Sequence, residues 1–279
     1  MQNTKEIIKK HNIHLTKSLG QNFLTDFNVV KKIVDAADIT EDDVVIEVGP
    51  GIGTMTLELA KRAKKVIAVE IDKRLIPALE DNLRNFSNVQ IINMDIMKTD
   101  INAIVSEYES SNIKVVANLP YYITTPIIMK FLEEDTKIDM MVFMIQKEVA
   151  QRIVAGPGSK EYGALSVAVQ YYSKPEKVFD VSPHCFIPQP DVDSTVIKLV
   201  VNEEPPVVLL DKNMFFKTVK CSFAQRRKTL INALYNAGKF KKSKEEIKEI
   251  LKSMGVDENV RGEMLSIQQF AMLSNLLSK

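Results

Sequence analysis

One stretch decides the fold of this 279-residue chain: Val44-Val45-Ile46-Glu47-Val48-Gly49-Pro50-Gly51-Ile52-Gly53-Thr54. It has the pattern of a buried strand, a glycine-rich turn and the start of an amphipathic helix. Glycines let the backbone approach a ligand closely, and the helix N-terminus directs N–H groups at it. The spacing is Gly-x-Gly-x-Gly, not the Gly-x-Gly-x-x-Gly of dinucleotide folds, which favours a nucleoside without a pyrophosphate.

Further strands alternate with helical segments after this turn. They are expected at residues 44–48, 65–69, 89–94, 115–118, 139–145, 177–181 and 194–201. The first four end at Gly49, Glu70, Asp95 and Asn118, which a parallel α/β sheet would place along one edge. Glu70 follows Gly49 at about the spacing of a ribose-binding acid, and Asp95 suits an adenine amine. Each acid alone could be a helix cap, but together they predict a site for S-adenosylmethionine beside a pocket for an amine.

The motif Asn118-Leu119-Pro120-Tyr121 follows the fourth strand. The exocyclic amine of a flat heterocycle is a poor nucleophile because its lone pair is delocalised into the ring. We expect the Asn118 side-chain oxygen and the Pro120 carbonyl to accept its two N–H bonds and localise the lone pair, while Tyr121 carries the base. Pro120 also restricts Leu119 to extended conformations. The alternative is a proline turn with a core tyrosine.

Two other segments complete the expected site. Residues 20–24 are too polar for a strand and are expected to form a loop before a helix capped by Asp26. Residues 182–190 form a proline-stiffened loop in which Phe186 is the one bulky ring. Phe186 opposite Tyr121 would make a sandwich for an extruded base. The alternative for Phe186 is a core side chain beneath a loop.

Composition predicts two domains in one protein of ordinary hydrophobicity, 45% by residue. We expect a domain at residues 1–203 and a small helical domain at residues 204–279, divided near Pro205 and Pro206. The charged first ten residues lack an export signal, and no apolar run approaches the roughly 20 residues that span a bilayer. Two cysteines are too few for a disulfide framework, so a cytoplasmic location is expected. The three histidines show no metal-ligand spacing, and no metal is expected.

The net charge of +1 conceals a basic segment. Residues 212–248 contain 11 Lys or Arg and 2 Glu, and periodic apolar residues there predict helices, one of them opened by residues 226–228. Nucleic acid is the expected partner of this segment, although a solvated helical face is the usual meaning of scattered lysines. The candidate RNA contacts are Lys217, Lys220, Arg226, Arg227 and Lys228.

With these residues in hand, the chain closely resembles the ribosomal RNA adenine N6-dimethyltransferases, specifically the KsgA type that acts on small-subunit RNA. The matching segments cover both expected domains: residues 20–24, 47–53, 118–121, 186–190 and 225–230. The resemblance implies a Rossmann-like class I methyltransferase sheet with a C-terminal all-helical domain. It implies S-adenosylmethionine contacts at Asn22, Leu24, Gly49, Gly51, Glu70, Asp95 and Asn118.

The resemblance also implies a reaction. Asn118 and Pro120 would position the adenine amine, with Tyr121 and Phe186 stacking on the base. Two methyl groups would go to each of two adjacent adenosines in the 3′-terminal hairpin of 16S rRNA, within the 30S subunit or its precursor. A monomer is expected, because no exposed apolar stripe stands out.

Three alternatives remain open. A 23S rRNA adenine dimethyltransferase of the macrolide-resistance type shares the fold, cofactor and chemistry, but the segments 190–194 and 225–230 look like the small-subunit type. A non-catalytic ribosome assembly factor could use the basic face alone, yet it would not need the complete set of cofactor and amine residues. A nicotinamide dehydrogenase is disfavoured by the glycine spacing and by the motif at residues 118–121.

Overall fold

The chain divides into two compact units. The computed structural model describes residues 4–13, 20–108, 111–134 and 136–278. Unit 1 comprises Met1–Ala150 and Pro175–Val201, and unit 2 comprises Gln151–Lys174 and Asn202–Lys279. The boundary expected near residue 203 left residues 151–174 in the first domain, whereas the structure groups them with unit 2. The reason is a shared core, because Tyr162 and Tyr171 pack with Phe215 and its neighbours.

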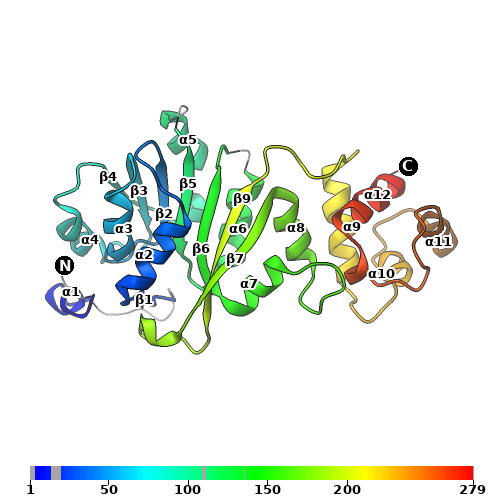
Figure 1. Cartoon of the computed structure of the whole chain (residues 1–279). Helices are drawn as coiled ribbons and strands as arrows, with labels where there is room; N and C mark the ends of the chain where they lie inside the picture. The colour runs from blue at the N-terminus through cyan, green and yellow to red at the C-terminus, as the bar shows by residue number, and fades with distance from the viewer. Residues whose placement is uncertain (1–3, 14–19, 109–110, 135, 279) are drawn as a thin grey trace. The chain divides into compact units, whose positions relative to one another are not determined.

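Unit 1 is built on a seven-stranded sheet with strand order β4-β3-β2-β5-β6-β9-β7 (Figure 1). The strands are β2 (Val44–Val48), β3 (Lys65–Glu70), β4 (Val89–Asn93), β5 (Ile113–Asn118), β6 (Met140–Gln146), β7 (Ser173–Val181) and β9 (Ser194–Val201). Strands β2 to β6 pair in parallel with their neighbours, and β9 pairs antiparallel with β6. The sheet confirms the predicted α/β fold.

Helices connect and cover these strands. They are α1 (Thr4–Lys10), α2 (Phe27–Ala36), α3 (Thr54–Ala60), α4 (Ile76–Leu83), α5 (Ile101–Val105), α6 (Thr124–Glu133) and α7 (Lys147–Val154), with short 3₁₀ turns η2 (Ile96–Lys98), η3 (Ser106–Tyr108) and η4 (Pro183–Cys185). Helices α2 and α3 cover one face of the sheet, where Val30 and Leu59 share a buried core with Val45 and Val116. The expected cap of α2 is confirmed, since the Asp26 carboxylate accepts a 2.9 Å hydrogen bond from the Asn28 N–H.

The register of the parallel strands sets the position of the site. Val48 of β2 is level with Val69 of β3 and with Ala117 of β5. The next residue along each strand is therefore at the same edge of the sheet, which brings Gly49, Glu70 and Asn118 together. This edge is where open α/β sheets bind their ligands.

A second, two-stranded sheet lies outside the main one. Strand β1 (Phe23–Leu24) pairs antiparallel with β8 (Phe186–Ile187), with Leu24 opposite Phe186. The expectation that residues 20–24 form only a loop is wrong at these two positions. Phe23 and Leu24 are both apolar and buried, and their pairing partner is supplied by a segment more than 160 residues away, which no local pattern reveals.

Unit 2 is helical, as expected for the C-terminal region. Its helices are α8 (Ala164–Tyr172), α9 (Lys212–Phe223), α10 (Leu230–Asn236), α11 (Lys244–Ser253) and α12 (Ile267–Leu277), with a 3₁₀ turn η5 (Gly262–Met264). Residues 226–228 lie in the turn between α9 and α10 and do not open a helix. Of the residues that the structure describes, none belong to a helix long and apolar enough to cross a membrane.

Candidate active site

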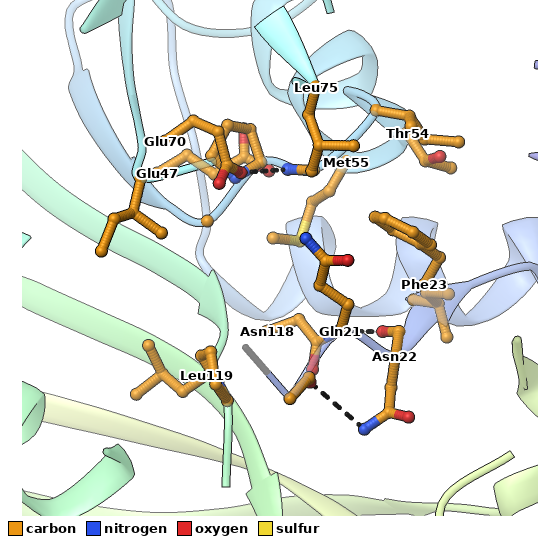
Figure 2. Close-up of a pocket in the computed structure, with 18 of the residues that line it drawn as sticks. Gln21, Asn22, Phe23, Glu47, Thr54, Met55, Glu70, Leu75, Asn118 and Leu119 are labelled. Carbon is orange, nitrogen blue, oxygen red and sulfur yellow. Dashed lines mark hydrogen bonds between the residues drawn. The ribbon is translucent and has the colours of Figure 1, made fainter. Parts of the chain in front are cut away.

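A cavity lies at the carboxyl edge of β2, β3 and β5, entirely within unit 1 (Figure 2). It is lined by residues 20–24, 30, 47, 49–52, 54, 55, 70, 71, 75 and 118–122. Three expected elements meet there: the glycine turn, the acid that ends β3, and the motif that follows β5. The N-terminal segment with Asn22 and Leu24 forms a further part of the wall.

Gly51 is a position where the glycine turn needs glycine for two reasons. Its φ of +61° lies in the left-handed region, and a Cβ there would lie 2.7 Å from the Phe23 ring. Its N–H donates a 3.0 Å hydrogen bond to Oε2 of Glu70. The turn is therefore held against both the N-terminal segment and the end of β3.

Glu70 is fixed by backbone donors. Its Oε1 accepts a 2.8 Å hydrogen bond from the Asp72 N–H, while Oε2 accepts from Gly51. Burial raises the pKa of Glu70, and these two backbone hydrogen bonds act in the opposite direction. A carboxylate oxygen can accept more than one hydrogen bond, so Glu70 can still accept bonds from the hydroxyls of a ribose.

The Asn118 side chain has a defined orientation. Its Nδ2 donates a 2.9 Å hydrogen bond to the carbonyl of Asn22 (Figure 2). That bond identifies the other amide atom, Oδ1, as the acceptor available to a ligand. The expected role of Asn118, accepting an N–H bond from an amine, matches this geometry.

The Pro120 carbonyl is already engaged. It accepts hydrogen bonds from the Ile123 N–H at 3.2 Å and from Oγ1 of Thr124 at 3.0 Å, which occupy both of its lone pairs. The backbone of Leu119 is engaged differently. The Leu119 N–H donates a hydrogen bond to the Met144 carbonyl, but the Leu119 carbonyl accepts no hydrogen bond from the described residues. Leu119 therefore offers the backbone acceptor that the sequence assigned to Pro120.

Tyr121 lines the cavity, and a hydrogen bond holds its side chain at the hydroxyl end. Its hydroxyl lies 2.8 Å from Oγ of Ser194, a fully buried residue at the start of β9. Burial raises the pKa of the Tyr121 phenol, and the Ser194 hydrogen bond partly opposes this. The ring is thus a fixed surface of the cavity and stays neutral at physiological pH.

Two expected site residues lie outside the cavity wall. Phe186 is 1% exposed and packs in the core with Val181 and Val196, so a stacking role would require its ring to leave that core. The Asp95 carboxylate accepts a 2.9 Å hydrogen bond from the Met97 N–H and caps η2. Asp95 therefore has the helix-capping role that is common for an acid after a strand.

Glu47 is a site residue that the sequence reasoning did not single out. It lines the cavity and is 1% exposed, and neither carboxyl oxygen has a hydrogen-bond partner among the described residues. Burial raises the pKa of Glu47 to about 8, and the Thr56 hydroxyl, which lies near but forms no hydrogen bond, opposes this only in part. An acid inside an otherwise apolar buried strand was the available sequence signal.

The basic candidates lie in unit 2 and differ in their surroundings. Arg226 donates to the carbonyls of Lys160 and Tyr162, at 2.6 Å and 3.1 Å, and so helps to hold the loop before α8. Arg227 and Lys228 are exposed in the same turn. On α9, Lys220 is exposed, and the Lys217 ammonium lies 5.3 Å from the centre of the Phe240 ring. Arg226 therefore has a structural role that sequence reasoning did not anticipate.

Among the residues that the structure describes, no three His, Cys, Asp or Glu side chains are grouped so as to hold a metal ion.

Comparisons with known proteins extend over nearly the whole chain. The model of the ribosomal RNA adenine dimethylase family matches residues 12–279. Ribosomal RNA small subunit methyltransferase A of Clostridioides difficile (strain 630) is 54% identical over 276 residues, which cover 99% of this chain and 95% of that protein. The protein of the same name from Geobacillus kaustophilus (strain HTA426) is 52% identical over 280 residues, with coverage of 99% and 95%.

Solved structures show the same fold. A dimethyladenosine transferase from Plasmodium falciparum superposes with a TM-score of 0.75 at 27% identity, covering 90% of this chain and 95% of that one. The 23S rRNA methyltransferase ErmE gives a TM-score of 0.71 at 25% identity, covering 92% and 100%. Both likenesses confirm the expected methyltransferase fold. Since the family model spans residues 12–279 and the relatives are more than half identical over that length, the chain belongs to the ribosomal RNA adenine dimethylase family.

Proposed function

We propose that this protein transfers methyl groups from S-adenosylmethionine to N6 of two adjacent adenosines in the 3′-terminal hairpin of 16S rRNA, dimethylating each during small-subunit biogenesis. The observation that carries the proposal is a single cavity that joins the glycine turn and Glu70 to the motif at residues 118–121. The names of the two bacterial relatives favour the small subunit as the substrate.

The cavity suits a nucleoside cofactor. Glu70 would accept hydrogen bonds from ribose hydroxyls, while Gly49 and Gly51 let the backbone approach the ligand. At Gly49 no atom lies within 4 Å of the position that a Cβ would take, which fits this close approach. Asn22 and Leu24 would close the cavity from the N-terminal side. When bound, S-adenosylmethionine supplies a methyl group on a positively charged sulfur, which makes that carbon electrophilic.

The residues after β5 would prepare the adenine amine. Oδ1 of Asn118 and, in place of the Pro120 oxygen, the carbonyl of Leu119 would each accept one N–H bond and localise the nitrogen lone pair. A new N–C bond would form as the C–S bond breaks, and the surplus proton would leave N6 to solvent. One N–H bond remains after the first transfer, so the second methylation can use the same acceptors. Tyr121 would support the base through its ring.

Basic side chains of unit 2 would contact RNA phosphates. Lys220, Arg227 and Lys228 are exposed on α9 or in the turn after it, and Lys217 is half-buried on α9; their positive charge suits this role. Arg226 would act indirectly by ordering the loop at residues 160–162.

Transfer of radiolabelled methyl groups to small subunits that lack the hairpin methylations tests the proposal. We expect label in N6,N6-dimethyladenosine of the small subunit and none in large-subunit RNA. Asn118→Ala removes the amine acceptor, and one lost catalytic hydrogen bond of this kind lowers rates by about 100-fold or more. Label on large-subunit RNA would instead indicate the resistance-type activity, and subunit binding without transfer would indicate an assembly factor.

A further inference from the structure

Glu47 is a buried acid of the cavity wall whose chemistry the proposed reaction leaves unused. It precedes Val48 at the end of β2, faces the cavity beside Glu70 and is 1% exposed (Figure 2). Within the described part of the chain, neither of its carboxyl oxygens has a hydrogen-bond partner. Leaving a buried polar group unpaired costs stability, and folded proteins keep few such groups. A ligand that pairs with Glu47 would explain why it is there.

The charges around Glu47 favour a cationic ligand. Glu70 of β3 is a second acid in the same wall, and its negative charge raises the pKa of Glu47 further. From α3, Thr56 faces Glu47, whereas the acid Glu58 is ion-paired with Lys61.

The neighbouring strand and the rest of the wall supply no compensating positive charge. The lysine of β5, Lys114, is engaged with Asp43, 2.8 Å away, at the opposite end of the sheet. The described residues that line the cavity include no Lys, Arg or His. Among the described residues, the cavity wall therefore holds two acids and no base, which favours a positively charged ligand.

We propose that Glu47 is the counter-ion of a positively charged centre of the bound cofactor, and that binding drives the Glu47 proton into solvent. The inference rests on the proposed function, because it takes S-adenosylmethionine as the ligand. That molecule carries two positive centres, the α-ammonium and the sulfonium. Binding of either centre would convert the neutral acid to a carboxylate and release one proton. The carboxylate would then form an ion pair with the positive charge of the ligand.

The proposal fixes how affinity depends on pH. Glu47, with a pKa of about 8 in the free protein, is protonated between pH 6 and pH 7. The α-ammonium of the ligand, with an ordinary pKa of about 7.7 to 8, also stays charged in that window. Binding must therefore expel a proton, and affinity should rise about tenfold from pH 6 to pH 7.

Titration calorimetry at pH 6.5, in buffers of different ionisation enthalpy, measures that proton directly. We expect the wild-type protein to release close to one proton per S-adenosylmethionine bound. Glu47→Gln keeps the shape and removes the charge, so it should bind more weakly, release no proton and lose the pH dependence. Glu58→Gln alters a buried acid outside the cavity and should behave like wild type. Thermal unfolding without ligand shows whether each variant folds.

Two further ligands separate the two positive centres. S-adenosylhomocysteine keeps the ammonium and lacks the sulfonium, and methylthioadenosine lacks both. Proton release with both of the first two ligands would assign the ammonium, and release with S-adenosylmethionine alone would assign the sulfonium. Equal release with methylthioadenosine, or release that persists in Glu47→Gln, would overturn the inference.

Failure of the inference and failure of the proposed function give different results. Tight binding of S-adenosylmethionine by the wild-type protein without proton release, and with constant affinity from pH 6 to pH 7, would overturn the inference alone. Absence of any binding by the wild-type protein would overturn the proposed function, and the inference with it. The wild-type titrations give this answer without any substitution.

Discussion

Individual side chains in the cavity are held so that particular atoms face the ligand. The Asn118 amide is oriented by its bond to the Asn22 carbonyl, and the Tyr121 hydroxyl by its bond to Ser194. Ser194 is fully buried and does not line the cavity, so any effect it has on catalysis must act through Tyr121. We therefore predict that Ser194 is a positioning residue.

A double-mutant cycle tests this role. A single hydrogen bond contributes about 1 kcal/mol, so we expect Ser194→Ala and Tyr121→Phe each to slow methyl transfer to small subunits by about fivefold. The double variant should be no slower than either single variant, because both changes remove the same bond. Effects that multiply in the double variant would show that the two residues act independently. Unchanged thermal unfolding midpoints would exclude loss of folding as the cause.

At the scale of elements, two very short strands shape the glycine turn. Pairing of β1 with β8 fixes Phe23, whose ring packs with Ile7, Ile52 and Leu75 and lies against Gly51. The turn is thus supported by residues remote in sequence. Gly49 has a similar φ of +66° but has no atom within 4 Å of its missing Cβ, which makes it a matched control for Gly51.

Alanine at these two glycines separates backbone strain from side-chain contact. Gly49→Ala should cost about 1 to 2 kcal/mol, because a left-handed conformation is unfavourable for alanine. Gly51→Ala carries the same strain and also displaces the Phe23 ring, so it should cost clearly more. Hydrogen exchange of the β2 and β3 amides measures both costs. In a Phe23→Ala background the two costs should become equal. A difference that persists there would show that the Phe23 ring is not the cause of the extra cost at Gly51.

At the scale of the whole molecule, Glu47 makes stability depend on pH. Its pKa of about 8 in the folded protein exceeds the ordinary value of 4.5, so the folded state binds the extra proton between these values. Stability of the unliganded protein should therefore fall as the pH rises from about 5 to 8. Asp72 and Asp180 have pKa values lowered to about 2 by their hydrogen-bond partners, and they affect stability only below about pH 4.

The unfolding midpoint of Glu47→Gln relative to wild type tests this linkage without any ligand. The variant cannot ionise at this position, so its midpoint minus that of wild type should increase by at least about 3 °C between pH 5 and pH 8. A difference that stays constant over this range would show that Glu47 ionises normally in the folded protein.

Local patterns were sufficient for the main sheet. Strand 44–48, the glycine turn and the polar ends at Glu70 and Asn118 were predicted because hydrophobic periodicity, turn glycines and strand order are properties of neighbouring residues. The same holds for the Asp26 cap. Parallel strands joined by helices then leave one edge for a site, which is why the sequence alone indicates where the cavity lies.

The α/β sheet, its glycine turn, the helical C-terminal region and the family can all be recognised from the sequence alone. Packing of the folded chain pairs β1 with β8, buries Phe186, sets Arg226 against a loop and leaves Glu47 without a hydrogen-bond partner among the described residues. The physical reason is the same in each case. These properties depend on which distant groups meet or fail to meet a side chain, and such encounters are set by packing of the whole chain and not by its local pattern.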